Sequence, residues 1–127
     1  MPATAMNHFT ILTDQLDETV KFYGELLELE PGKRPNFKFP GAWLYKEGQA
    51  ILHVIAGDKM PEPREGVIDH MAFSATGLVD MVERLKSRSI EYDLRRLEDA
   101  NVWQLFFFDP NGAKVELDFD LSEPAPA

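Results

Sequence analysis

Apolar and polar positions follow strand and helix periods in the same order twice along the chain. Residues 6–13 are rich in apolar and β-branched residues, which predicts a strand. Asp14 then provides an N-cap for a helix that runs to about Leu27, along which apolar residues spaced i, i+4 and i+7 share one face. A weak strand near Leu29 and a hairpin over residues 43–55 complete this half of the chain.

The second half repeats this order of elements. A strand over residues 67–75 precedes a helix over residues 78–88, which Thr76 is expected to cap. Three more strands are predicted at residues 90–94, 102–108 and 113–119. The last two are joined by Asp109-Pro110-Asn111-Gly112, a sequence that favours a tight turn. One strand, one helix and three strands in each half predict an α+β fold.

The two halves also align residue by residue. Asn7-His8-Phe9 falls on Asp69-His70-Met71 at an offset of 62, and residues 50–54 fall on residues 113–117 at an offset of 63. Prolines and charged residues over 60–66 are typical of a surface connection between the copies. We therefore expect a single domain over residues 1–127, built from βαβββ modules at 6–59 and 67–120 and a flexible tail at 121–127. The modules should form a curved mixed sheet around a metal-binding cavity.

Four residues that can bind metals obey this repeat. His8 and His70 hold the same position in the first strand of each half, and His53 and Glu116 hold the same position in the last strand. A lone histidine in an apolar strand is more often a hydrogen-bonded core residue, but four unrelated core residues would not follow the repeat. A carboxylate between Val115 and Leu117 is also costly to bury without a cation or a donor. The pattern predicts one metal site with these four ligands.

The ligand types narrow the choice of metal. Three imidazoles and one carboxylate, without a thiolate, suit a divalent first-row transition metal: Ni, Co, Fe, Zn or Mn. Four protein ligands leave an octahedral ion two adjacent positions, which a substrate with two neighbouring oxygens could fill.

The chain resembles the vicinal oxygen chelate superfamily, which includes glyoxalase I, bleomycin-resistance protein and extradiol dioxygenases. The resemblance extends from Asn7 to Leu117, and its most specific motifs are Phe22-Tyr23-x-x-Leu26-Leu27 and Phe108-Asp109-Pro110-Asn111-Gly112-x-x-x-Glu116. The family's metal positions fall on the same four residues, with the position of His53 used in four-ligand members. This resemblance implies a glyoxalase-like lyase or isomerase that acts on a small substrate with vicinal oxygens.

In that reaction Glu116 is the expected catalytic base, because a loosely bound carboxylate ligand can also accept a proton. The assignment departs from glyoxalase I at His53, where that enzyme is expected to carry a second carboxylate. An extradiol-type dioxygenase is the first alternative, since it needs only two histidines and one carboxylate. A drug-sequestering protein without catalysis, like the bleomycin-resistance proteins, is the second, although such members generally lack the ligand set.

Further residues are candidates for substrate binding. Trp43, Tyr45 and Trp103 are expected to line the cavity wall, with a place in the core as the competing interpretation. Arg95 could form paired hydrogen bonds with an acidic group of the substrate. Thr10 shares a strand face with His8, as a fosfomycin-transferase-like site would require, but the acidic C-terminal end does not match that branch.

Composition sets the remaining expectations. The chain has 22 acidic and 13 basic residues, a formal net charge of −9 and no cysteine. Such a surface repels phosphate backbones and anionic lipids, so neither nucleic acid nor a membrane is an expected partner. We expect a cytoplasmic protein with a small-molecule substrate. The family often pairs modules across a homodimer, whereas two modules in one chain could also close a site alone.

Overall fold

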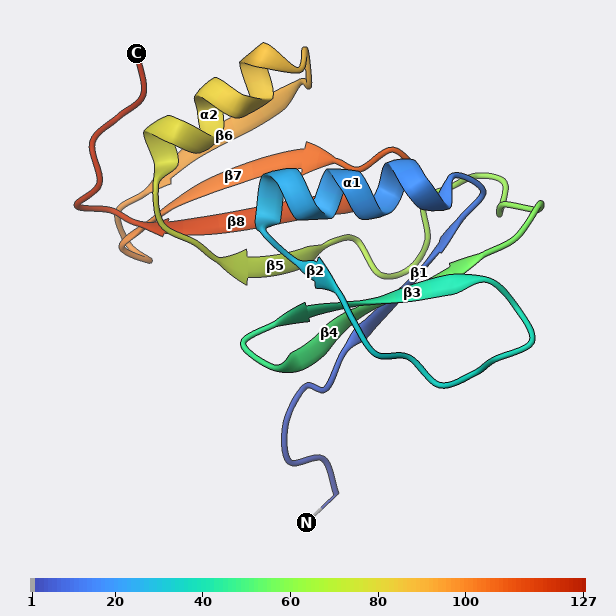
Figure 1. Cartoon of the computed structure of the whole chain (residues 1–127). Coiled ribbons are helices and arrows are strands. Elements are labelled where there is room, and N and C mark those ends of the chain that lie inside the picture. Colours follow the sequence, from blue (N-terminus) through green and yellow to red (C-terminus); the bar gives the residue numbers. More distant parts are fainter. Residues whose placement is uncertain (1) are drawn as a thin grey trace. The chain divides into compact units, whose positions relative to one another are not determined.

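The computed structural model describes residues 2–127, so Met1, the first residue of the expected domain, lies outside the described residues (Figure 1). The chain divides into two compact units, one ending at Arg64 and the other beginning at Glu65. The first unit consists of β1 (Phe9–Thr13), α1 (Leu16–Leu27), β2 (Glu30–Pro31), β3 (Gly41–Lys46) and β4 (Gln49–Ala56). The second consists of β5 (Met71–Ser74), α2 (Leu78–Ser87), β6 (Tyr92–Leu97), β7 (Val102–Phe108) and β8 (Lys114–Asp120).

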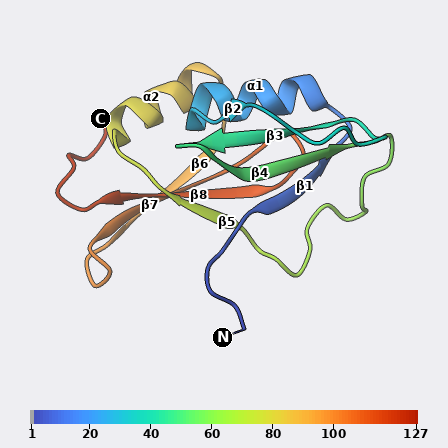
Figure 2. The ribbon, with the colours of Figure 1, turned by 60° about the horizontal axis from the view of Figure 1, so that its bottom comes forward.

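Both units have the same strand topology. The sheets have the orders β1-β4-β3-β2 and β5-β8-β7-β6, and in each the first pair is parallel and the other pairs are antiparallel. Figure 2 shows β4 between β1 and β3, and β8 between β5 and β7. The predicted α+β class with two βαβββ modules is therefore confirmed, with one curved four-stranded mixed sheet in each unit.

Each sheet has one apolar face. In the second unit the buried positions alternate along β7 and β8, where Leu105, Phe107, Val115 and Leu117 point to the same side. The buried stripe of α2 has the helical spacing that matches such a face, and it consists of Leu78, Met81, Val82 and Leu85. The alternate strand positions, among them Glu116, therefore face the other side of the sheet.

The predicted helix caps are wrong. The residue before α1 is Gln15, not Asp14, and no side-chain cap bond forms there. Instead, the Thr13 hydroxyl accepts a hydrogen bond from the Gln15 N–H at 2.8 Å. At α2 the capping position is Gly77, whose φ of 88° strongly favours glycine, rather than Thr76.

The N-terminus of α2 is capped by a side chain from residues 121–127, the segment that was expected to be a flexible tail. The Glu123 carboxylate accepts hydrogen bonds from the N–H groups of Gly77 (3.0 Å) and Leu78 (2.8 Å). The Glu123 carbonyl also accepts a hydrogen bond from the Trp103 indole at 3.1 Å. These contacts join residues that are 20 to 46 positions apart in the sequence, so local sequence patterns did not anticipate them.

Among the strands, the observed boundaries differ most from the predicted ones at β5. It begins at Met71 rather than at residue 67, because Val67 and Ile68 are exposed and pair with no strand in the described part of the chain. The hairpins and the turn before β8 agree closely with expectation, and Asp109 Oδ1 accepts the N–H groups of Asn111 and Ala113, each at 2.8 Å. Neither helix within residues 2–127 has the length and apolar character needed to cross a membrane.

Candidate metal and substrate site

The four predicted ligands hold equivalent places in the two sheets. His8 directly precedes β1, and His70 directly precedes β5. His53 lies opposite Thr10 across the parallel β1–β4 pair, while Glu116 lies opposite Ala72 across the β5–β8 pair. Since residue 72 is the counterpart of residue 10 in the repeat, the backbone register of each unit supports the alignment seen in the sequence.

In the first unit the two histidines stack on each other. The ring centroids of His8 and His53 are 3.7 Å apart, and Trp43 stacks on the other face of His53 at 4.0 Å. His53 Nε2 lies 3.1 Å from the Ala50 carbonyl oxygen, which can only accept, so Nε2 carries the proton. Burial, followed by the nearby His8, lowers the pKa of His53 below its usual value, which favours the neutral ring that metals bind.

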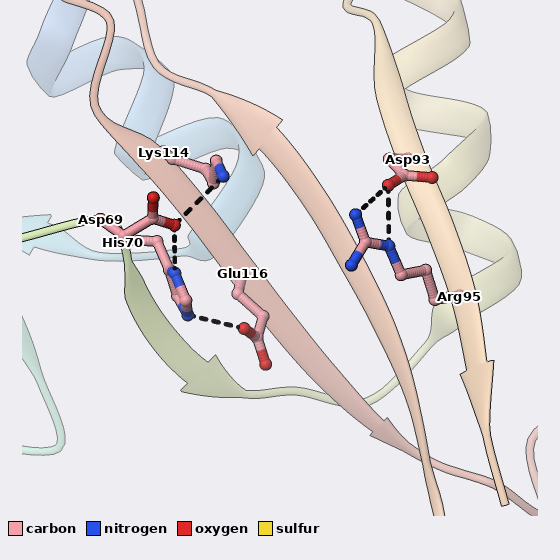
Figure 3. A network of polar contacts seen from close by, with 6 residues as sticks. All are labelled: Asp69, His70, Asp93, Arg95, Lys114 and Glu116. Carbon is pink, nitrogen blue, oxygen red and sulfur yellow. Dashed lines mark hydrogen bonds and ion pairs between the residues drawn. The ribbon is translucent and has the colours of Figure 1, made fainter. Parts of the chain in front are cut away.

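In the second unit a histidine meets a buried carboxylate (Figure 3). His70 Nε2 lies 2.9 Å from Glu116 Oε1, and the amide of Gln104 donates a hydrogen bond to Glu116 Oε2 at 3.2 Å. His70 Nδ1 lies 2.9 Å from Asp69 Oδ2, which also accepts from Lys114 Nζ at 3.1 Å. Nδ1 of His70 faces Asp69 and Nε2 faces Glu116, so a cation bound at Nε2 would lie next to the Glu116 carboxylate.

The residues directly before His8 and His70 make the same contact with the histidine ring. Asn7 Oδ1 lies 2.7 Å from His8 Nδ1, just as Asp69 Oδ2 lies beside His70 Nδ1. A bond at Nδ1 orients the imidazole and leaves Nε2 as the metal-binding nitrogen, the arrangement that metal-bound histidines usually adopt. The hydrogen bonds from His70 first, and then from Lys114, lower the pKa of Asp69, so this carboxylate stays charged.

Three of the four predicted ligands direct a donor atom that could bind a divalent ion, whereas His53 does not. His8, His70 and Glu116 each direct a suitable donor atom away from its orienting partner, whereas His53 directs Nε2 at the Ala50 carbonyl and lies flat on His8. Parallel stacked rings cannot both aim in-plane lone pairs at one ion. Across residues 2–127, no three carboxylate or imidazole side chains stand together as a complete ligand group.

A second carboxylate lies next to Glu116 on the same face of β8. Burial, together with the neighbouring Glu116, raises the pKa of Asp118 from 3.8 to about 6. Asp118 Oδ1 is buried without a hydrogen-bond partner, which is consistent with a carboxyl that resists ionisation. The two acids therefore form a pair in which one proton is held more tightly than by an exposed aspartate.

Some of the residues predicted to bind substrate lie on the same sheet face as a predicted ligand, and Trp103 does not. Thr10 and Trp43 flank His53 in register across β1, β4 and β3, so these two share the histidine's face. Tyr45 donates its hydroxyl hydrogen to the Lys33 carbonyl. Trp103 does not reach the face of Glu116: it is 8% exposed and lies on the apolar side of its sheet. Trp103 is therefore a core residue, which was the competing interpretation of its place in the sequence.

Arg95 and Arg96, adjacent in sequence, point to opposite sides of β6. The Arg95 guanidinium lies over the Phe106 ring at 5.0 Å and pairs with Asp93, on the side of Glu116. The Arg96 guanidinium instead lies over Trp103 at 5.2 Å and pairs with Glu98.

Sequence reasoning missed the polar residues around His70 and Glu116, namely Asp69, Gln104, Lys114 and Asp118. A signal for Asp69 was present, because it is the counterpart of Asn7 in the repeat and both directly precede a histidine. The others could be found only from the strand register, since Gln104 and Asp118 are opposite each other across β7 and β8.

Comparison with known proteins identifies the family to which the chain is similar. The model of the Glyoxalase/Bleomycin resistance protein/Dioxygenase superfamily matches residues 5–117. The chain is 30% identical over 121 residues to Glyoxylase I 4 of Arabidopsis thaliana, a match that covers 90% of this chain and 70% of that protein.

Solved structures show the same fold at lower identity. A glyoxalase family protein from Bacillus anthracis superposes with a TM-score of 0.74 at 20% identity, covering 93% of this chain and 96% of that one. The fosfomycin resistance protein FosX from Listeria monocytogenes, solved with Mn(II) and a dihydroxypropylphosphonic acid, also gives a TM-score of 0.74, at 17% identity and with 93% of both chains covered.

Proposed function

Because the chain belongs to the glyoxalase/bleomycin resistance protein/dioxygenase superfamily, we propose that it is a divalent-metal-dependent lyase or isomerase of the glyoxalase type. Its substrate is a small molecule with vicinal oxygens. The observation that carries this proposal is the contact between His70 Nε2 and the buried Glu116 carboxylate at 2.9 Å. A buried carboxylate beside an oriented imidazole is a costly arrangement that a bound cation would compensate.

The proposed ligands are His8, His53, His70 and Glu116, for one ion of Ni, Co, Fe, Zn or Mn. Support comes from the repeat, from the Nδ1 contacts that turn Nε2 of His8 and His70 outward, and from the absence of thiolates in the sequence. Binding by His53 would require its ring to leave the Ala50 carbonyl and unstack from His8. A bound ion would act as a Lewis acid that polarises the substrate oxygens.

Glu116 is the proposed catalytic base. Its Oε2 receives a hydrogen bond from Gln104 and its Oε1 faces His70, so the carboxylate is oriented by two partners from different strands. It would remove a proton from a substrate carbon next to a carbonyl group and return it at a neighbouring atom, which is the transfer that isomerisation requires. Burial excludes water, which otherwise weakens the basicity of a carboxylate toward a carbon acid.

One observation favours a second candidate, an extradiol-type dioxygenase. With His53 held at the Ala50 carbonyl, the remaining donors are His8, His70 and Glu116. Two histidines and one carboxylate are the ligand set of non-haem iron oxygenases, which keep open positions for substrate and oxygen.

Elemental analysis of protein purified without an affinity-tag metal tests the proposal. His70→Ala and Glu116→Ala should each lose most of the bound metal, while the exposed Glu98→Gln should retain it. Full metal occupancy in both ligand variants would refute the metal site. His53→Ala distinguishes the candidates: weaker binding favours the four-ligand lyase or isomerase, whereas unchanged binding of iron with oxygen uptake on a catechol selects the dioxygenase.

A further inference from the structure

The second unit contains a cavity of about 440 Å³ beside His70 that is lined by residues of β6, β7 and β8. All of its lining residues belong to this unit, so the cavity is defined by one sheet and the segment before it. Its lining includes Arg95, Phe106, Lys114 and His70. None of the residues assigned above as metal ligands, other than His70, contributes to its wall.

Two cations of the cavity contact the same aromatic ring. Arg95 on β6 places its guanidinium 5.0 Å from the Phe106 ring centroid, and Lys114 on β8 places its ammonium group 5.9 Å from the same centroid. Phe106 lies on β7 between them, and the His70 ring approaches it edge-on at 5.8 Å. Cation–π attraction favours this placement of both charges beside the aromatic ring.

Each cation already has a carboxylate partner, but one that is easily exchanged. Arg95 donates through Nε and Nη2 to Asp93 Oδ2, both at 2.9 Å, and Lys114 donates to Asp69 (Figure 3). The Asp93 and Asp69 side chains are 57% and 73% exposed. Ion pairs this exposed contribute little to stability, so an entering acidic group can share or replace them at small cost.

The carboxylates in the wall disfavour a ligand with several negative charges. Asp69, Asp93 and the neighbouring Glu91 oppose the two cations, so the cavity as a whole does not attract a multiply charged anion. Recognition must therefore come from directed hydrogen bonds of the Arg95 fork and the Lys114 ammonium group. A planar carboxylate matches such a fork better than it matches a diffuse positive patch.

We propose that this cavity binds the carboxylate of a small monocarboxylic acid whose flat apolar body rests on Phe106. A ligand bound in this way would lie directly beside His70, the residue that the proposed function assigns to the metal. A small monocarboxylic acid is therefore the substrate class that we assign to the proposed metal site. This assignment, unlike the binding of the carboxylate, rests on the proposed function. Binding of the carboxylate itself requires neither metal nor turnover.

Calorimetric titration of the chelator-treated full chain with phenylacetate and with its neutral analogue phenylacetamide tests the proposal. Phenylacetate should bind at least about tenfold more tightly, because only the acid forms charge-assisted hydrogen bonds with Arg95 and Lys114. Arg95→Gln should remove about tenfold of the phenylacetate affinity and leave phenylacetamide unaffected. Lys114→Gln should weaken the acid in the same direction.

Arg96→Gln is the matched control, since it removes the same charge from the adjacent residue, whose guanidinium lies over Trp103 and outside the cavity. This variant should bind phenylacetate as the parent does. Equal affinity for acid and amide, failure of both to bind, or equal losses in Arg95→Gln and Arg96→Gln would each overturn the proposal. A protein that binds phenylacetate but purifies without metal would refute the proposed function alone.

Discussion

Replacing Asp118 by asparagine should change how the stability of the metal-free protein depends on pH. The pKa of Asp118 is raised from 3.8 to about 6, chiefly by burial and then by Glu116. In the unfolded chain this carboxyl ionises at the lower pH, so between these values the unfolded state has lost a proton that the folded state keeps. The free energy of unfolding therefore falls as pH rises through this window. Asparagine removes the ionisation and keeps a hydrogen-bond donor toward Glu116.

The size of the effect follows from the two pKa values. One pKa unit corresponds to about 1.36 kcal/mol, so the rise to about 6 sets a ceiling of about 3 kcal/mol above the window. Asp118 is partly exposed, and solvent screening reduces this to about 1–2 kcal/mol. Asp118→Asn should therefore gain about that much stability over the parent between about pH 4 and pH 7.

Urea unfolding of chelator-treated protein, followed by the fluorescence of Trp43 and Trp103, measures this difference at each pH. Asp120→Asn is the control with opposite sign, because hydrogen bonds from Ser122 lower the pKa of Asp120. The stabilisation that Asp120 gives the parent protein is present above the pKa of the unfolded chain. It is lost as pH falls through the lower pKa of the folded protein. A difference between Asp118→Asn and parent that stays constant from about pH 4 to pH 7 would show that the carboxyl ionises normally.

Three further outcomes are expected. Asp69→Asn keeps an acceptor for His70 Nδ1 but removes its charge, so metal affinity measured by competition with a chelator should fall about tenfold, and an unchanged affinity would contradict this role. Glu116→Gln should retain some metal and lose about 10²–10⁴-fold in kcat, with near-normal turnover arguing for a different base. Glu123→Ala should cost about 1 kcal/mol in the free energy of unfolding, because the α2 N-terminus loses its carboxylate, and a fully stable variant would show that the cap is dispensable.

Local signals in the sequence were sufficient for the order of elements and for the pairing of candidate residues. The repeat offset predicted the same position in the first strand for His8 and His70, and the structure places each of them directly before that strand. The offset between His53 and Glu116 correctly placed both on the last strand of a unit. These inferences needed only strand periodicity and the assumption that repeated sequences fold alike. The Asp109 turn was equally local, because aspartate bonds its own backbone two and four residues on.

The features that the sequence did not predict depend on contacts between residues far apart in the chain. Neither the cap of α2 by Glu123 nor the exposure of Val67 and Ile68 follows from any neighbouring residue. The same holds for the face of Trp103, which depends on the register between β7 and β8. A shift of that register by one residue would exchange the face of Trp103 with that of Gln104.

The repeat preserves backbone pairing while the chemistry of the two units has diverged. Where the first unit stacks His53 between His8 and Trp43, the second holds Glu116 between His70 and Gln104. Burial, and then the nearby His8, lower the pKa of His53 in the first unit, whereas the second unit gathers carboxylates and cations around its histidine. The residues proposed for carboxylate recognition and for proton transfer therefore all lie in the second unit. Because its ionic residues can be varied without touching the first unit, separate substitutions can distinguish metal binding, base catalysis and carboxylate recognition.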